Sequence, residues 1–213
     1  MQDKISLLIG SCDSYSHLWK SFDSLLRKYW KIDCHKIFVG ETIPIPYKGY
    51  ENVLPGAAAW GARMLAGLER VKTPYVMLLL EDYFFSEPFG EERLNYGFEM
   101  MQKYQADKFC WDTAHPDYRL ENLEGNIFKL KSDSMYFTSC QPSIWKTDFL
   151  KTCFLPEYSP WCFELSGTER ISKESPVVVM EQLEKRFYFN AVRRGLQPSP
   201  GLNEFKKKEK LWN

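Results

Sequence analysis

The sequence lacks any hydrophobic run long enough to cross a bilayer as a helix, which takes about 18 consecutive apolar residues. Its first residues, Met1-Gln2-Asp3-Lys4, lead into a short apolar stretch without the layout of a signal peptide. We therefore expect a cytoplasmic protein, with any membrane contact made at the inner face of the plasma membrane.

Histidine is scarce, with three residues, and none of the six cysteines forms a C-x-x-C pair. This scarcity disfavours a structural zinc site and favours buried free thiols in a reducing compartment. Excess charge is also absent, because 28 basic residues balance 28 acidic ones, which argues against nucleic acid as the main partner. No G-x-G-x-x-G follows the first expected strand, which disfavours a dinucleotide dehydrogenase.

What is present is a regular alternation of apolar patterns in the first half of the chain. Uniformly apolar runs predict strands, and apolar residues at helical spacing predict helices between them. Tyr75 to Leu80 is apolar throughout, which is typical of a central strand buried on both faces. We expect an α/β fold, with strands at Lys4 to Ile9, Lys36 to Val39, Tyr75 to Leu80 and Lys108 to Trp111, and helices at His17 to Trp30, Ala57 to Arg70 and Glu91 to Tyr104.

The second half of the chain is less regular. Its patterns predict a hairpin over Tyr118 to Lys131 that turns at Glu124-Gly125-Asn126. Further along we expect strands at Tyr136 to Cys140 and Val177 to Met180, and helices at Lys146 to Cys153 and Glu181 to Arg194.

The strongest chemical signal is the pair Glu81-Asp82, which directly follows the apolar run Leu78-Leu79-Leu80. Two adjacent carboxylates repel each other, and a neighbouring apolar core makes their charged forms costly. A divalent cation offsets both penalties, because Mg²⁺ and Mn²⁺ prefer hard oxygen ligands and can bridge to a diphosphate. The alternative is a solvated acidic turn at the end of a strand.

Several motifs occur together in a recognisable order. The sequence has S-C-D-S-Y after the first strand, then W-x-x-R-M-L-x-G-L-E, T-P-Y-V-M-L-L-L-E-D-Y-F-F, S-x-Q-P-S-I-W-K and S-P-W-x-F-E. This set resembles bacterial GT-A-fold glycosyltransferases, related to family 2, that build capsule, lipopolysaccharide or similar surface glycans. The resemblance runs from about Lys4 to Glu164, with a weaker echo in Tyr188 to Gly195.

The resemblance implies a single glycosyltransferase domain over residues 1–213, with a Rossmann-like, mostly parallel sheet flanked by helices. Residues 1–112 would form the nucleotide-sugar-binding half, and residues 113–213 an irregular acceptor-binding half. The implied reaction moves a sugar from a nucleotide-sugar donor to a hydroxyl of a glycan or lipid-linked acceptor, with inversion.

The resemblance also implies a set of donor-site residues. Glu81 and Asp82 stand where such enzymes carry their metal and diphosphate motif, although E-D-Y has no second aspartate two residues on. The resemblance therefore leaves open whether the protein needs a metal, and which of the two carboxylates would be the direct ligand. The implied nucleotide-sugar contacts are Ser11, Asp13, Tyr15, Arg63, Glu81 and Asp82, with Mn²⁺ or Mg²⁺ as the cofactor. For Asp13, capping of the following helix is the alternative role.

On the acceptor side, the segment Ser159 to Glu164 resembles the part of these enzymes that supplies a pocket tryptophan and a general base. Glu164 is the candidate base and Trp161 the candidate pocket residue, while Asp112 is the rival base. Gln141 and Trp145 would line the acceptor pocket, with core packing as the alternative.

Two other functions remain open on the residues alone. A nucleotidyltransferase acting on sugar phosphates also uses acidic residues and a metal, but the loop Gly10-Ser11-Cys12-Asp13 lacks the basic residues such an enzyme uses for phosphate. A non-catalytic carbohydrate-binding module could use the abundant aromatic residues. The lysine-rich run at Lys206 to Lys210 is either a solvated tail or a peripheral contact with an anionic membrane.

Overall fold

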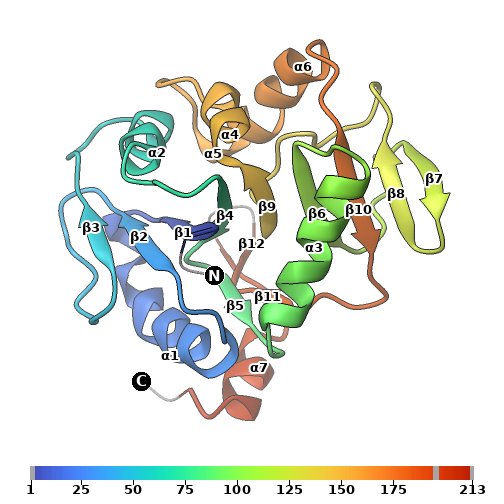
Figure 1. Cartoon of the computed structure of the whole chain (residues 1–213). Helices are drawn as coiled ribbons and strands as arrows, with labels where there is room; N and C mark the ends of the chain where they lie inside the picture. Colours follow the sequence, from blue (N-terminus) through green and yellow to red (C-terminus); the bar gives the residue numbers. More distant parts are fainter. Residues whose placement is uncertain (1–2, 194–196, 212–213) are drawn as a thin grey trace.

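The computed structural model describes residues 3–193 and 197–211 of the 213-residue chain. Over these residues, nine strands form one sheet in the order β3-β2-β1-β4-β9-β6-β10-β8-β7, with helices on both faces (Figure 1). Strands from both halves of the sequence share this sheet, and their alternation with helices gives an α/β architecture.

The first four strands in the sheet are parallel to one another. They are β1 (Ile5–Gly10), β2 (His35–Val39), β3 (Glu51–Val53) and β4 (Tyr75–Leu80). All six residues of β1 are buried, as are the four inner residues of β4. The apolar run at Tyr75 to Leu80 therefore forms the central strand that its composition predicts.

The remaining strands are β6 (Lys108–Asp112), β7 (Leu120–Glu124), β8 (Ile127–Leu130), β9 (Ser143–Lys146) and β10 (Val178–Gln182). Strand β9 lies between β4 and β6 and is antiparallel to both, while β10 runs parallel to β6. Among the described strands of this sheet, only β8 and β9 are antiparallel to the rest. The expectation of a mostly parallel sheet is confirmed.

Helices cover the two faces of the sheet (Figure 1). Helix α1 packs Trp19 against Phe38 of β2, with ring centroids 5.1 Å apart, while Gly67 of α2 lies against the next residue, Val39. Because neighbouring residues of a strand point to opposite faces, α1 and α2 cover different faces. The helices are η1 (Asp13–Leu18), α1 (Trp19–Tyr29), α2 (Trp60–Leu68), α3 (Glu91–Lys103), α4 (Thr147–Cys153), α5 (Pro160–Glu164), α6 (Ser166–Ser172) and α7 (Leu202–Lys208).

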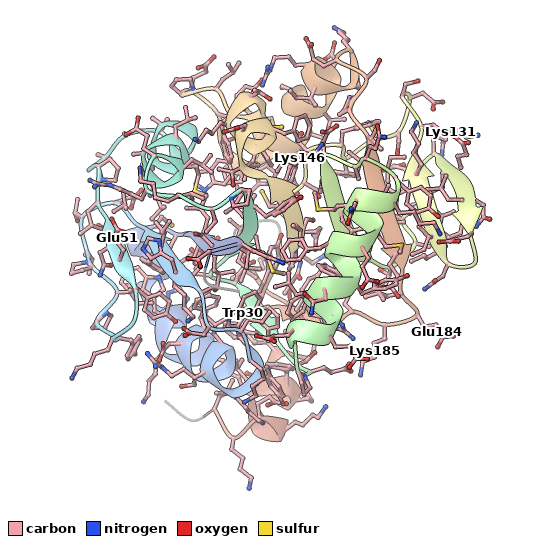
Figure 2. The ribbon with its side chains drawn as sticks, in the orientation of Figure 1. Trp30, Glu51, Lys131, Lys146, Glu184 and Lys185 are labelled. Carbon is pink, nitrogen blue, oxygen red and sulfur yellow. The ribbon has the colours of Figure 1, made fainter. Side chains whose placement is uncertain are left out.

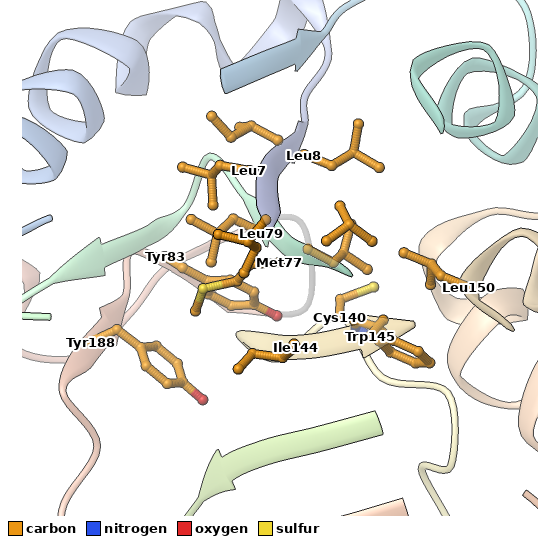
Figure 3. Close-up of a cluster of buried hydrophobic side chains, with 14 of the residues drawn as sticks. Leu7, Leu8, Met77, Leu79, Tyr83, Cys140, Ile144, Trp145, Leu150 and Tyr188 are labelled. Carbon is orange, nitrogen blue, oxygen red and sulfur yellow. The ribbon is translucent and has the colours of Figure 1, made fainter. Parts of the chain in front are cut away.

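The hydrophobic core is centred on β1, β4 and β9 (Figure 3). Leu8, Leu79 and Ile144 are fully buried there, and Trp145 on β9 is fully buried as well. Its ring centroid lies 6.0 Å from that of Phe149 on α4. This close-packed centre holds the ends of β1 and β4 in fixed positions.

Two predicted elements are wrong. Tyr136 to Cys140 is not a strand: Tyr136 has φ 65°, a left-handed conformation that a strand does not accommodate. The described residues of Glu181 to Arg194 do not form a helix. Strand β10 continues to Gln182, and the strands β11 (Tyr188–Asn190) and β12 (Val192–Arg193) follow. Strand β11 pairs with β5 (Tyr83–Phe85), and this tertiary pairing overrides the local helix propensity.

In the described residues, no helix is long and apolar enough to span a membrane. The short strand β13 (Gln197–Pro198) pairs with β12 after the undescribed residues 194–196.

Candidate functional site

A cavity of about 450 Å³ lies at the carboxyl ends of the central parallel strands. Three strands deliver polar residues to it, because parallel strands end at the same edge of a sheet. The backbone N–H of Ser11 donates to the carbonyl of Val39 at 2.8 Å, and that of Glu81 donates to the carbonyl of Gly10 at 3.3 Å. These bonds fix the loops that follow β1, β2 and β4 beside one another.

The opposite wall of the cavity comes from the second half of the chain. It consists of Cys140 and Gln141, helix α5, and the strands β11 and β12. The loop before α5 is tied to α2, because the N–H of Gly61 donates to the carbonyl of Tyr158 at 2.7 Å. A Cβ at position 61 would lie 2.1 Å from the carbonyl oxygen of Leu155, so this close approach requires glycine.

Arg63 is a buried side chain of α2 that reaches the cavity wall. Its Nη1 donates to the carbonyl of Ser11 at 2.8 Å, and its Nη2 lies 3.4 Å from Oε1 of Glu41. The guanidinium therefore holds the loops after β1 and β2 together while it faces the cavity.

Asp13 is oriented toward the loop after β2. Its Oδ1 accepts hydrogen bonds from the N–H groups of Thr42 and Ile43, each at 3.2 Å, and its Oδ2 accepts one from the Thr42 hydroxyl at 2.5 Å. These bonds hold the pKa of Asp13 below its usual value. Asp13 is not among the described residues that line the cavity, whereas its neighbours Cys12 and Ser14 are.

For Asp13→Ala we expect a lower melting temperature, because three hydrogen bonds between the two loops are lost. The lowered pKa means that this stabilisation is present at neutral pH and disappears as pH falls below about 4. Thermal melts of both proteins at pH 7 and pH 3.5 test this. A variant that melts like the wild type at pH 7 but binds nucleotide less tightly would instead place Asp13 in the ligand site.

Glu81 is almost fully buried and lines the cavity at the end of β4. Burial, followed by repulsion from Asp82, raises the pKa of Glu81 to about 8. Hydrogen bonds from the Ser11 hydroxyl and the Cys12 backbone oppose this rise. The Ser11 hydroxyl is itself oriented, because the Trp19 indole N–H donates to it at 2.8 Å.

Asp82 is partly buried and has one unsatisfied carboxylate oxygen. Burial raises the pKa of Asp82 to about 7, and the carboxylate of Glu164 adds to this rise. Its Oδ1 is buried and has no hydrogen-bond partner in the described part of the chain. An unpaired buried carboxylate oxygen is costly, and a bound cation removes that cost.

The raised pKa values predict how stability depends on pH. Both carboxylates bind protons more tightly in the folded state, so the free energy of unfolding of the metal-free protein should fall as pH rises from about 5 to 8. Each pKa unit corresponds to about 1.4 kcal/mol. Urea unfolding in EDTA at pH 5.5, 7 and 8.5 measures the slope. A Glu81→Gln/Asp82→Asn variant with the same slope as the wild type would assign it to other groups.

Glu164 faces the same cavity from α5. The helix begins at Pro160, and the Ser159 hydroxyl oxygen caps it by accepting the Cys162 N–H at 3.1 Å. Oε1 of Glu164 accepts the N–H of Cys140 at 2.8 Å. Burial raises the pKa of Glu164 above its usual value, which makes the carboxylate a stronger base.

The other acceptor-side candidates lie in different places. Trp161 is at the rim of the cavity and is 54% exposed, and Gln141 lines the cavity and accepts a hydrogen bond from the Tyr188 hydroxyl. Trp145 is in the core, with none of its surface exposed. Of the sequence candidates, Ser11, Tyr15, Arg63, Glu81, Asp82, Gln141, Trp161 and Glu164 therefore line one cavity.

Asp112 is hydrogen-bonded to residues that do not line the cavity. Its Oδ1 accepts from Nε of Arg186 at 2.7 Å and from the Thr113 N–H at 2.8 Å, and its Oδ2 accepts from the Tyr118 hydroxyl at 2.6 Å. It is absent from the described lining of the cavity. These contacts give it a structural role at the end of β6.

Sequence reasoning missed several residues of the cavity. Glu41 follows β2 with one intervening glycine, and the same strand-end rule that picks out Asp13 could have found it. Asn190 and Val192 lie in strands that the sequence predicts as helix, so no local pattern indicates them.

Comparison with known proteins gives matches at the level of structure. No known protein-family profile and no curated protein matches the sequence. The structure of S. aureus TarS matches 89% of this chain at 14% identity, with a TM-score of 0.59. The structure of S. aureus TarS 1–349 in complex with UDP-GlcNAc matches 90% of this chain at 13% identity, with a TM-score of 0.58. UDP-glucose pyrophosphorylase complexed with UDP-glucose matches 84% at 13% identity with a TM-score of 0.50.

The chain has a GT-A-like fold. It spans 37% of the TarS chain, 59% of the TarS 1–349 chain and 90% of the pyrophosphorylase chain. At these low identities the likeness concerns the fold, which confirms the fold class expected from the sequence.

Proposed function

We propose that this protein transfers a sugar from a nucleoside-diphosphate sugar to a hydroxyl of a glycan or lipid-linked acceptor, with inversion at the anomeric carbon. The observation that carries the proposal is the arrangement of one cavity, which has Glu81 and Asp82 on its strand-end wall and Glu164 on the α5 wall. The matched structures that contain UDP-GlcNAc, UDP and UDP-glucose support a nucleotide-sugar donor.

The donor would lie against the loops after β1 and β4. Ser11 and Tyr15 line this side, and Arg63 presents a buried guanidinium whose Nε has no partner in the described residues. A guanidinium matches phosphate oxygens well. We propose uracil as the base of the donor nucleotide, because three of the matched structures contain UDP-GlcNAc, UDP and UDP-glucose.

The negative charge of the cavity favours binding of a cation together with the donor. Among the described lining residues, Arg63 is the only basic side chain, and it faces four carboxylates, those of Glu41, Glu81, Asp82 and Glu164. A diphosphate would meet net repulsion in such a site. A divalent cation held by these carboxylates would offset this repulsion and would supply charge stabilisation for the leaving diphosphate.

The residues present fit Mn²⁺ or Mg²⁺ in one particular way. No group of three or more histidine, cysteine or acidic side chains in the described residues could hold a metal ion by itself. Mg²⁺ is commonly bound by one or two carboxylates together with substrate phosphates and water. We propose that Asp82, through its unpartnered Oδ1, holds the cation with help from Glu81, and that the diphosphate completes the site.

Glu164 would act as the general base. With Oε1 held by the Cys140 N–H, the second carboxylate oxygen would take the proton from the acceptor hydroxyl. The hydroxyl oxygen then forms a bond to the anomeric carbon as the bond from that carbon to the diphosphate breaks. Trp161 at the rim and Gln141 in the wall would bind the acceptor sugar. The motifs of the sequence support an acceptor in a bacterial surface polysaccharide.

A nucleotidyltransferase is the second candidate, because the pyrophosphorylase shares the fold. Such an enzyme must hold a triphosphate or pyrophosphate, and the loop Gly10 to Tyr15 contributes no basic residue to do so. A carbohydrate-binding module is less consistent with the adjacent carboxylates of Glu81 and Asp82, whose pKa values are raised to about 8 and 7.

Incubation with UDP-sugars and Mn²⁺ distinguishes these functions. A glycosyltransferase releases UDP, and faster when an acceptor glycan is present. A nucleotidyltransferase releases UTP and sugar 1-phosphate only when pyrophosphate is added. Tight binding of glycan without either product would favour the binding module.

A further inference from the structure

The lysine-rich segment near the end of the chain is a docked helix rather than a free tail. Leu202 of α7 is buried, and the ring of Phe205 stacks on Phe189 with centroids 4.7 Å apart and an interplanar angle of 11°. These inward contacts leave Lys207 and Lys208 exposed to solvent. The lysines therefore have a fixed place on the folded surface.

Helix α7 is also joined to helix α1, and Figure 1 shows the two at the same end of the molecule. Oε2 of the buried Glu209 accepts hydrogen bonds from Nζ of Lys28 and from the hydroxyl of Tyr29, each at 2.8 Å. The contact places the last turn of α1 beside the end of α7, so the basic residues of the two helices lie at the same end of the molecule.

This surface carries a strong local charge. Residues 19–31 and 202–211 contain eight basic and three acidic side chains, in a chain whose net charge is zero. Two of the three acidic side chains, Asp23 and Glu209, are buried and pair with Arg27 and Lys28, which leaves six basic side chains on these segments outside these two pairs. The eight basic residues, which we call the basic surface, are Lys20, Arg27, Lys28, Lys31, Lys206, Lys207, Lys208 and Lys210.

We propose that the basic surface binds a membrane of anionic phospholipids. Seven of its eight members are lysines, whose flexible, point-like charges suit many mobile headgroups better than one fixed phosphate. The partly buried Leu211 adjoins them in the sequence and adds an apolar side chain beside the lysines. This inference does not depend on the proposed enzymatic activity.

Co-sedimentation with vesicles tests the proposal. The full-length protein should bind vesicles of 70% phosphatidylcholine and 30% phosphatidylglycerol at 50 mM salt, and should bind far less at 500 mM salt or to pure phosphatidylcholine. Each lysine near such a surface contributes about a fivefold factor. We therefore expect Lys207→Gln/Lys208→Gln to weaken binding at least tenfold.

A matched pair of substitutions controls for the change in net charge. Lys131 and Lys173 are exposed and lie away from α1 and α7, as Figure 2 shows for Lys131. Lys131→Gln/Lys173→Gln should bind the vesicles like the wild type. Equal losses in both variants, or no binding to the anionic vesicles at low salt, would overturn the proposal. Binding to soluble long-chain polyphosphate but not to vesicles would also overturn it.

Discussion

The Glu164→Gln enzyme should lose sugar transfer by about 10²–10⁴-fold, which is the usual contribution of a general base. Its affinity for the nucleotide should hardly change, because the proposed base contacts the acceptor. The amide oxygen of glutamine can still accept the N–H of Cys140, so the fold should survive and the melting temperature should stay close to that of the wild type. Steady-state transfer rates and calorimetric nucleotide titrations measure the two effects separately.

Asp112→Asn is the control for this prediction, because Asp112 is the rival base in the sequence. We expect it to lower the free energy of unfolding by about 1.5–3 kcal/mol, because its carboxylate is hydrogen-bonded to Arg186 and Tyr118. Transfer by the folded fraction should remain within a few-fold of the wild type. An active Glu164→Gln enzyme together with an inactive Asp112→Asn enzyme would show that Asp112 is the general base.

Asp82→Asn should weaken the Mn²⁺-dependent binding of a nucleoside diphosphate at least tenfold. Asparagine keeps the size of the side chain but replaces a charged ligand oxygen by a neutral amide, which is a poorer ligand for a hard cation. The metal-free variant should melt no lower than the wild type at pH 8, because it no longer places a buried negative charge beside Glu81 and Glu164.

This pair of results separates a metal ligand from a structural residue. A structural carboxylate would give a lower melting temperature together with weaker binding. Unchanged affinity with Mn²⁺ would remove Asp82 from the site, and Glu81→Gln, measured in the same way, would show whether its neighbour is the ligand.

The sequence predicts the first half of the fold well because each element there carries its own signal. The apolar run Tyr75 to Leu80 identifies β4, and the carboxylates that follow it, Glu81 and Asp82, lie in the cavity. The loop after β1 is found by the same rule, although Asp13 within it is oriented toward Thr42. Side-chain orientation within a loop depends on contacts with distant segments, which a local pattern does not contain.

The second half is harder to predict because tertiary contacts decide its local structure. Strand β9 has only four residues and lies between two longer strands, whereas Tyr136 to Cys140 has a more strand-like composition and forms a loop. That loop supplies the Cys140 N–H that holds Glu164, a contact that only the folded chain brings together. Trp145 shows the same limit of prediction from sequence. Its motif resembles a segment that lines an acceptor pocket, but its side chain is buried in the core.

Binding of a nucleoside diphosphate in the presence of Mn²⁺ tests the central claim most directly. A thermal-shift screen of UDP, GDP, ADP and CDP, each with and without Mn²⁺, covers the donor bases. A ligand at 100 times its Kd stabilises a protein by about 2.7 kcal/mol, which for this chain length corresponds to about 5–10 °C. We predict such a shift for UDP with Mn²⁺, a smaller one without the metal, and a clearly reduced one in Asp82→Asn. No shift with any of the four nucleotides, or an undiminished shift in Asp82→Asn, would contradict a nucleotide-sugar site at Glu81 and Asp82.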